Sequence, residues 1–351
     1  MSVPLSRTAR LAAYDSASTA LSRLDDRQLT RLLAGAVPAD AGGGGRAARL
    51  AVGTVPVLVR RIPLTDRELL AGNVMSTADV FRLPPACHYG VRSPGFGAWR
   101  ELAVHGTTTD WVLLDESQNF PLMYHWRVLP SPGVPVPEEL ADVEKVVGHW
   151  EGSPAVRARV EELGRASYSA VLFLEYIPLT LWAWLAGRTA EGGGSAASAW
   201  AAADRGLRSG TAFMNSRGLL HFDTRLENVL TDGHRLYFTG FGLALHERFT
   251  RSPQEARFFR DHRDYDRGAT ASHLAHWLVS ALCGHRQDKG DALLRHCAEG
   301  GEPAGLPGAA AELVTRYAPV AAVMADFHGL LHGGGPAAVF PARQVREALA
   351  G

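Results

Sequence analysis

The sequence predicts a protein of the α+β class built as two lobes. The chain has 351 residues, which is enough for two domains or lobes around a large buried core. Apolar, β-rich runs that are typical of strands, at 54–62 and 169–178, lie in its first half. The second half contains a strongly helical segment at 196–216 and a further helical pattern at about 270–282. We therefore expect a β-rich first lobe followed by a mainly helical second lobe.

The charges of the chain balance, with 36 basic and 36 acidic residues. This balance favours neither nucleic acid nor an anionic membrane as a partner. No apolar run of 18 residues suggests a transmembrane helix, and the first residues lack the apolar region of a signal peptide. Three widely spaced cysteines, Cys87, Cys283 and Cys297, suit a reducing compartment. We expect a cytoplasmic protein that binds neither nucleic acid nor membrane.

The first lobe is expected to begin with a helical extension at about 6–33, where apolar residues recur at helical spacing. A glycine run at 42–45 then precedes the strand at 54–62, which ends in the adjacent cations Arg60 and Arg61. The remaining expected elements are a helix at 97–105 that carries Glu101, a strand at 120–129, a Pro-rich loop, a charged helical region at about 138–163 and the strand at 169–178.

A polar loop in the second lobe carries the residues that suggest chemistry. Its sequence, HFDTRLENVL, places Asp223 five residues before Asn228, with Arg225 between them. In phosphoryl transfer an Asp orients the acceptor hydroxyl, a carboxamide holds a metal ion that bridges the phosphates, and a cation stabilises the transferring group. Short strands at 229–230 and 235–239 are expected around a tight Asp-Gly turn. Upstream, we expect a short helix at 180–187 and a Gly-rich surface loop at 191–195.

This loop and the turn after it resemble two motifs of protein kinases. Residues 221–228 resemble the catalytic loop H-R-D-x-x-x-x-N, and residues 240–244, GFGLA, resemble D-F-G-L-A with its Asp replaced. The pattern is similar to an actinobacterial-type kinase-like protein over about 42–282. The resemblance implies a bilobal protein kinase-like fold, with an N-terminal helical extension at 1–36, an N-lobe at 37–177 that contains a helical insertion at about 130–168, and a C-lobe with a helical tail at 178–351.

The resemblance also implies roles for individual residues, with ATP and Mg²⁺ as cofactors. Asp223 orients the acceptor hydroxyl, Asn228 holds Mg²⁺ and Arg225 stabilises the transferred charge. The nucleotide-binding residues that it implies are Gly43 and Gly44 in the Gly-rich turn, Arg60 paired with Glu101 at the phosphates, and the backbone of Glu175 and Ile177 at the adenine. In addition, Asp264 or Asp266 is expected to brace the catalytic loop.

Three departures from the kinase pattern bear on activity. Gly240 replaces the Asp that is the principal metal ligand, and Arg60 replaces a Lys. Phe222 replaces the Arg that reads phosphorylation of the activation loop, so regulation by such phosphorylation is not expected. One interpretation is an ATP-dependent phosphotransferase to a hydroxyl acceptor, with weakened or lost activity and a small molecule or a protein as acceptor. The alternative is a pseudokinase that acts as a binding or scaffolding module.

Two pairs of histidines have a spacing that would place both members on one face of a helix. These pairs are His273 with His276, and His328 with His332. The spacing suits zinc, but no carboxylate or Cys partner stands at motif spacing. Core or surface histidines are the favoured interpretation.

Overall fold

The computed structural model describes residues 6–39, 47–131, 136–284, 287–335 and 338–350. The fold is of the α+β class, with antiparallel sheets and many helices, as expected. The helices are α1 (Arg7–Ser22), α2 (Asp26–Ala34), α3 (Asp66–Leu69), α4 (Ala98–Leu113), α5 (Glu138–Ala141), α6 (Val143–His149), α7 (Pro154–Gly164), α8 (Leu181–Glu191), α9 (Gly193–Ser216), α10 (Pro253–Asp261), α11 (Tyr265–Cys283), α12 (Gln287–Ala298), α13 (Gly308–Gly334) and α14 (Ala342–Ala350), with short 3-10 turns η1 (Pro85–Tyr89) and η2 (Phe241–Leu243). The strands are β1 (Val37–Pro38), β2 (Ala47–Val52), β3 (Val55–Leu64), β4 (Met123–Pro130), β5 (Tyr168–Glu175), β6 (Leu179–Thr180), β7 (Leu219–Leu220), β8 (Val229–Thr231), β9 (Leu236–Phe238) and β10 (Leu245–His246).

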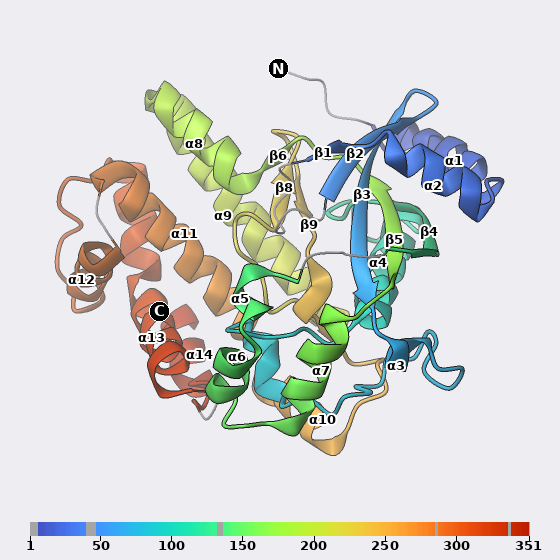
Figure 1. Ribbon diagram of the computed structural model, residues 1–351. Coiled ribbons are helices and arrows are strands. Elements are labelled where there is room, and N and C mark those ends of the chain that lie inside the picture. Colours follow the sequence, from blue (N-terminus) through green and yellow to red (C-terminus); the bar gives the residue numbers. More distant parts are fainter. Residues whose placement is uncertain (1–5, 40–46, 132–135, 285–286, 336–337, 351) are drawn as a thin grey trace.

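The first half of the chain is organised around a five-stranded antiparallel sheet in the order β1-β2-β3-β5-β4 (Figure 1). Successive side chains of a strand point to opposite faces, so β3 and β5 each contribute to two cores. Val59 and Phe173 belong to the core that includes Leu21 of α1, whereas Leu58 and Leu172 belong to the core that includes Leu102 of α4. Helices α1 and α4 therefore pack on opposite faces of the sheet.

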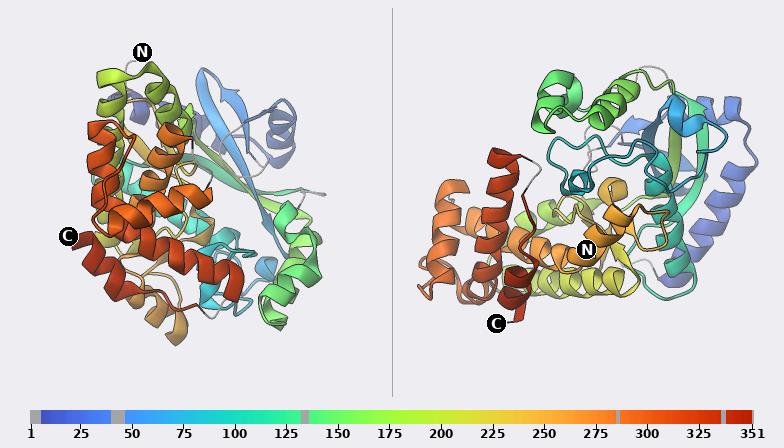
Figure 2. Two further views of the ribbon diagram at one scale, coloured as in Figure 1. Left: turned by 90° about the vertical axis from the view of Figure 1, so that its left-hand side faces the viewer. Right: turned by 90° about the horizontal axis from the view of Figure 1, so that it is seen from below.

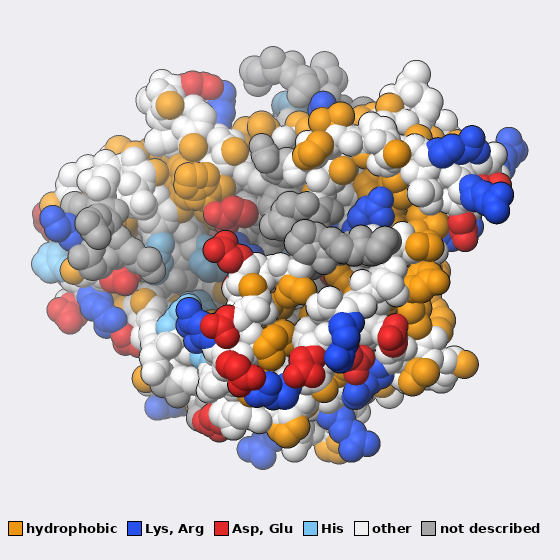
Figure 3. Space-filling model, viewed as in Figure 1, with side chains coloured by type: hydrophobic (Ala, Val, Ile, Leu, Met, Phe, Trp, Pro, Cys, Tyr) orange, Lys and Arg blue, Asp and Glu red, His pale blue; other side chains and the backbone are white. Residues whose placement is uncertain are grey.

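Three helices, α5 to α7, lie in sequence between the paired strands β4 and β5. Their apolar side chains, such as Val146 and Val160, form a separate core with Phe81 and Phe96 from the long segment before α4. Figure 3 shows basic and acidic side chains interspersed over the face of the molecule that includes these helices. On this face, basic and acidic side chains are mixed, and no large patch carries charges of one sign, in line with the balanced composition of the chain.

The second half is mainly helical, and Figure 2 shows its helices gathered on one side of the molecule. The small sheets β6-β8-β9 and β7-β10 are formed by residues 179–246, in the first part of this half of the sequence. The Gly-rich loop expected at 191–195 was wrong, because α8 ends at Glu191 and α9 already begins at Gly193. Gly192 alone separates the two helices, with a φ of 71° that favours glycine. Among the described helices, none is both long and apolar enough to cross a membrane.

Several boundaries differ from the sequence-based expectation. Helix α4 continues to Leu113, α11 already begins at Tyr265, and β4 begins only at Met123. The residues between Phe120 and Met123 keep the apolar character of a strand, but a side chain of another element binds the backbone carbonyl of Phe120. Arg10 of α1 donates to the carbonyl of Phe120 over 2.7 Å. Tertiary contacts of this kind set element ends that local patterns leave open.

Candidate active site

One buried carboxylate holds the loop at 221–228 through hydrogen bonds to its backbone. Asp266, in the first turn of α11, accepts hydrogen bonds from the backbone amides of His221 at 2.6 Å and Phe222 at 2.8 Å. Asp264, the other candidate, instead pairs with Arg267 and with Arg346. Burial raises the pKa of Asp266 despite these two amide donors. The structure thus assigns the bracing role to Asp266.

The two amide donors point at one carboxylate because the loop turns sharply at Phe222. This residue has a φ of 62°, which is uncommon for a residue with a side chain. Its ring is buried among the aromatic rings of His88, Tyr89, Phe258 and Tyr265, with centroids 4.9–6.4 Å away. In the kinase pattern an Arg at this position binds a phosphate. Here the ring of Phe222 makes apolar contacts instead.

Asp223 lies at the surface end of the loop, where it forms a two-pronged contact with Arg225. The Nε atom of Arg225 lies 2.7 Å from Oδ1 of Asp223, and Nη2 lies 3.2 Å from Oδ2. The Asp223 carboxylate raises the pKa of Arg225. Asn228 donates from Nδ2 to the backbone carbonyl of Asp223 over 3.0 Å, which fixes its carboxamide beside the loop. All three predicted catalytic residues therefore lie together.

The GFG turn packs directly against this loop. Gly240 has a φ of 81°, and a Cβ atom there would lie 2.8 Å from Cγ and 2.9 Å from Oδ1 of Asn228. Phe241 packs between His221, at a centroid distance of 4.9 Å, and His105 of α4, at 5.0 Å. A side chain at position 240 would thus project toward the Asn228 carboxamide, which is the residue expected to hold a metal.

Arg60 and Glu101 form the ion pair that the sequence suggested. Nε of Arg60 lies 2.8 Å from Oε1 of Glu101, and the Arg60 side chain keeps a quarter of its area exposed. The other carboxylate oxygen of Glu101 lies 3.3 Å from where a Cβ of Gly242 would be. Arg61 points to the opposite face of β3 and donates to Ser131 over 3.2 Å. Strand alternation therefore selects Arg60 over its neighbour.

Together these contacts form a continuous series from the strand cation to the catalytic-like loop. Arg60 contacts Glu101, Glu101 lies beside Gly242, Gly240 lies beside Asn228, and Asn228 is bonded to Asp223. The residues come from four separate parts of the chain. The series links a cation, a carboxamide and an acid, which are groups of the kinds that phosphoryl transfer uses.

The segment that ends β5 is anchored by an arginine that the sequence did not single out. Arg10 of α1 is buried and contacts both carboxylate oxygens of Glu175, at 2.8 and 2.6 Å. Its guanidinium also donates to the backbone of Gln118 and stands 5.2 Å from the ring of Tyr237. Arg10 is one of several arginines in the helical extension, and no local pattern distinguishes it. The side chain of Glu175 is therefore engaged, and its backbone amide donates to the carbonyl of Leu122 over 2.7 Å.

The other predicted nucleotide-binding residues differ in how far the structure describes them. Ile177 is buried and packs with Leu230 and Tyr237 in a small apolar cluster next to the loop. Gly43 and Gly44 lie outside the described residues. The strands on either side of them, β1 and β2, pair in an antiparallel register in which Val37 faces Arg49.

The histidine pairs do not assemble a metal site in the part of the chain that is described. His276 pairs with Asp291 at 3.0 Å, and burial lowers the pKa of His273. No group of three or more His, Cys, Asp or Glu side chains able to hold a metal ion was found among the described residues. In the described residues these histidines make local hydrogen bonds, such as those of His276 with the carbonyl of Ser272 and of His332 with the carbonyl of His328.

Comparison with known proteins adds no family assignment. No protein-family model matches the chain, and no curated protein matches it at a significant level.

Proposed function

We propose that this protein has a bilobal kinase-like fold that binds ATP and transfers its terminal phosphoryl group weakly to a hydroxyl acceptor. The observation that carries the proposal is the contact series from Arg60 through Glu101 and the GFG turn to Asn228 and Asp223. A structural ion pair alone has no need of a neighbouring carboxamide and acid. A phosphoryl-transfer site needs all of these groups together.

The residues present suit the phosphates of a nucleotide and suit a metal ion less well. Arg60 offers a partly exposed guanidinium that can bind phosphate while Glu101 orients it. Asn228 offers one amide oxygen, but Gly240 adds no oxygen where a second ligand would stand. When bound, Mg²⁺ would neutralise charge on the phosphates. Asp223, held by Arg225, would orient the acceptor hydroxyl, which belongs to a small molecule or a protein.

The second candidate is a pseudokinase that binds nucleotide or a protein partner without turnover, and Gly240 favours it. A metal ion supplies several kcal/mol of transition-state stabilisation. Each ~1.4 kcal/mol corresponds to about a tenfold change in rate. Loss of the principal metal ligand therefore lowers the rate by roughly a thousandfold or more unless another oxygen replaces it.

The experiment that tests the proposal is thermal unfolding with ATP, with and without Mg²⁺. A ligand that binds only the folded state adds about 2.7 kcal/mol at a hundred times its dissociation constant. We expect ATP to raise the midpoint, and Arg60→Ala to remove most of this rise. Arg61→Ala is the matched control, because Arg61 lies on the other face of the same strand.

The outcomes separate the two candidates. A rise that Mg²⁺ increases supports a working metal site at Asn228 and the phosphotransferase. A rise that is indifferent to Mg²⁺ supports the pseudokinase. If ATP causes no rise, or if Arg60→Ala and Arg61→Ala behave alike, the assignment of this surface to a nucleotide is wrong.

A further inference from the structure

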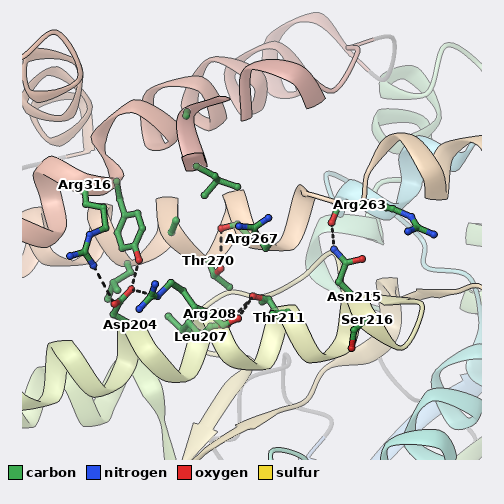
Figure 4. A pocket seen from close by; sticks show the side chains of 16 residues that line it. Asp204, Leu207, Arg208, Thr211, Asn215, Ser216, Arg263, Arg267, Thr270 and Arg316 are labelled. Carbon is green, nitrogen blue, oxygen red and sulfur yellow. Dashed lines mark hydrogen bonds and ion pairs between the residues drawn. The ribbon is translucent and has the colours of Figure 1, made fainter. Parts of the chain in front are cut away.

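A second site lies in the helical half of the molecule. Helices α9, α11, α13 and α14 surround a cavity of about 550 Å³ (Figure 4). None of the residues proposed above for nucleotide or acceptor lines it. The cavity is within the size range of pockets that bind small molecules. The cavity is therefore separate from the site proposed above and large enough for a small ligand.

The floor of the cavity is apolar in character. Leu207, Leu274 and Leu349 line it together with alanines from three helices. Two threonines lie on the facing walls, but their hydroxyls already donate to helix carbonyls. Thr211 donates to Leu207 over 2.8 Å, and Thr270 donates to Asp266 over 2.8 Å. A ligand on this floor would thus meet mainly hydrocarbon and few free donors.

The rim of the cavity is strongly basic. Four arginines line it against a single lining carboxylate: Arg208, Arg263, Arg267 and Arg316 against Asp204. Figure 4 shows Arg208 and Arg316 beside Asp204 at one end and Arg267 farther along α11, whereas the side chain of Arg263 extends away from the cavity. Asp204 is already engaged by the Tyr317 hydroxyl, by Arg208 at 3.4 Å and by Arg316 at 3.6 Å.

The end of the cavity near Arg267 has the most available positive charge. The guanidinium of Arg263 lies 5.8 Å from the ring of Phe259 and extends away from the cavity, so it does not add to this charge. Arg267 shares Asp264 with Arg346, so two cations stand against one acid there. Arginines bind carboxylate and phosphate groups through paired N–H donors. An anionic group is the complement of this end.

We propose that the cavity binds an amphipathic organic anion, with an apolar body on the Leu207–Leu274 floor and a carboxylate or phosphate at Arg267. The apolar floor disfavours a wholly polar ligand such as inorganic phosphate, because its hydration would be lost without replacement donors. The basic rim disfavours a neutral apolar ligand, because it offers the head group charge-assisted hydrogen bonds only if that group is anionic.

The test uses calorimetric titration with decanoate, decyl phosphate and decanol at submicellar concentrations. The two anions should bind saturably at a single site, at least about tenfold more tightly than decanol, as the loss of one charged contact predicts. Ala212→Trp fills the cavity from the exposed side of α9 and should abolish binding. Arg267→Gln should weaken binding of the anions by about tenfold or more. Arg257→Gln, an exposed arginine of α10 outside the cavity, is the control.

Three results would overturn the proposal. Equal affinity for decanol and decanoate would remove the role of the arginines. Undiminished binding to a folded Ala212→Trp variant would place the ligand elsewhere. Absence of saturable binding by either anion would show that the cavity is no site for this class of compound. Circular dichroism melting of each variant separates these results from misfolding.

Discussion

At the scale of single residues, Gly240 decides what the site can do. Its backbone is in the left-handed region, and the carboxamide of Asn228 stands where a side chain would project. Asp and Asn tolerate this backbone conformation better than other residues with a Cβ. A Cβ atom at position 240 would lie 2.8 Å from Cγ of Asn228, so the Asn228 side chain would have to shift to admit one. The missing metal ligand is therefore a property of one side chain rather than of the backbone around it.

We predict that Gly240→Asp raises Mg²⁺-dependent ATP turnover by tenfold or more. The new carboxylate would stand beside the Asn228 oxygen and complete a pair of oxygen ligands for a hard cation. Gly240→Asn is the matched control, since it has nearly the same shape and backbone preference but no charge. Initial rates of ATP hydrolysis at several Mg²⁺ concentrations measure the effect. Equal rates for the two folded variants would show that the metal ligand is not what limits activity.

At the scale of elements, helix α4 is fixed at two places, Ala98 and Arg100, which keeps Glu101 beside Arg60. The buried Glu68 accepts from the backbone amide of Ala98 at the start of the helix over 3.0 Å, and it pairs with Arg159 of α7 at 2.6 Å. A carboxylate at a helix start is favourable to the helix dipole. Arg100 of α4 pairs with Glu255 of α10 at 2.7 Å, and both side chains are almost fully buried. The segment after the GFG turn is thus tied to α4 without any phosphorylated residue.

We predict that Glu255→Gln lowers the free energy of unfolding by about 3–5 kcal/mol, because it leaves Arg100 buried without its countercharge. The glutamine can retain the capping contact that Glu255 makes with the amide of Ser252, so the loss reports the ion pair. Urea unfolding measures it. Glu144→Gln breaks the exposed pair with Arg157 and should leave the midpoint unchanged. Similar behaviour of the two variants would show that the buried pair contributes no more than a surface one.

The elements also show which contacts and element ends could be predicted from the sequence. The pairing of Arg60 with Glu101 was implied by the resemblance to kinases, which left Arg61 as an adjacent alternative, and the structure pairs Arg60. Arg10 with Glu175 and Arg100 with Glu255 were not predicted. Each pair joins residues more than 150 positions apart, and a buried arginine has no local pattern that separates it from an exposed one. Local patterns also missed the start of α9, since the glycines at 193–194, which are typical of a loop, already belong to this helix.

At the scale of the whole molecule, many histidines are inside the protein rather than on its surface. Those whose pKa is lowered chiefly by burial include His88, His105, His246, His262 and His328. The pKa of His105 falls to about 3, and those of His246, His262 and His328 fall to about 4. The unfolded chain takes up protons at these residues below about pH 6.5, whereas the folded protein does not. Their contribution is complete above that pH and is lost progressively as the pH falls toward 3–4.

His105 allows this acid sensitivity to be tested at one residue. It lies on α4, is fully buried against Phe241, and neither ring nitrogen has a hydrogen-bond partner among the described residues. Arg60 and His221 further oppose its protonation. If a histidine stays neutral in the folded protein, lowering the pH from 7 to 5 reduces the free energy of unfolding by about 2 kcal/mol. We predict that His105→Leu reduces the loss of unfolding free energy over this range by about that amount. It should also be more stable at pH 7, because leucine leaves no buried polar atom unpaired. Urea unfolding at pH 7, 6 and 5 measures both effects, and an equal loss in variant and parent would place the acid sensitivity in other residues.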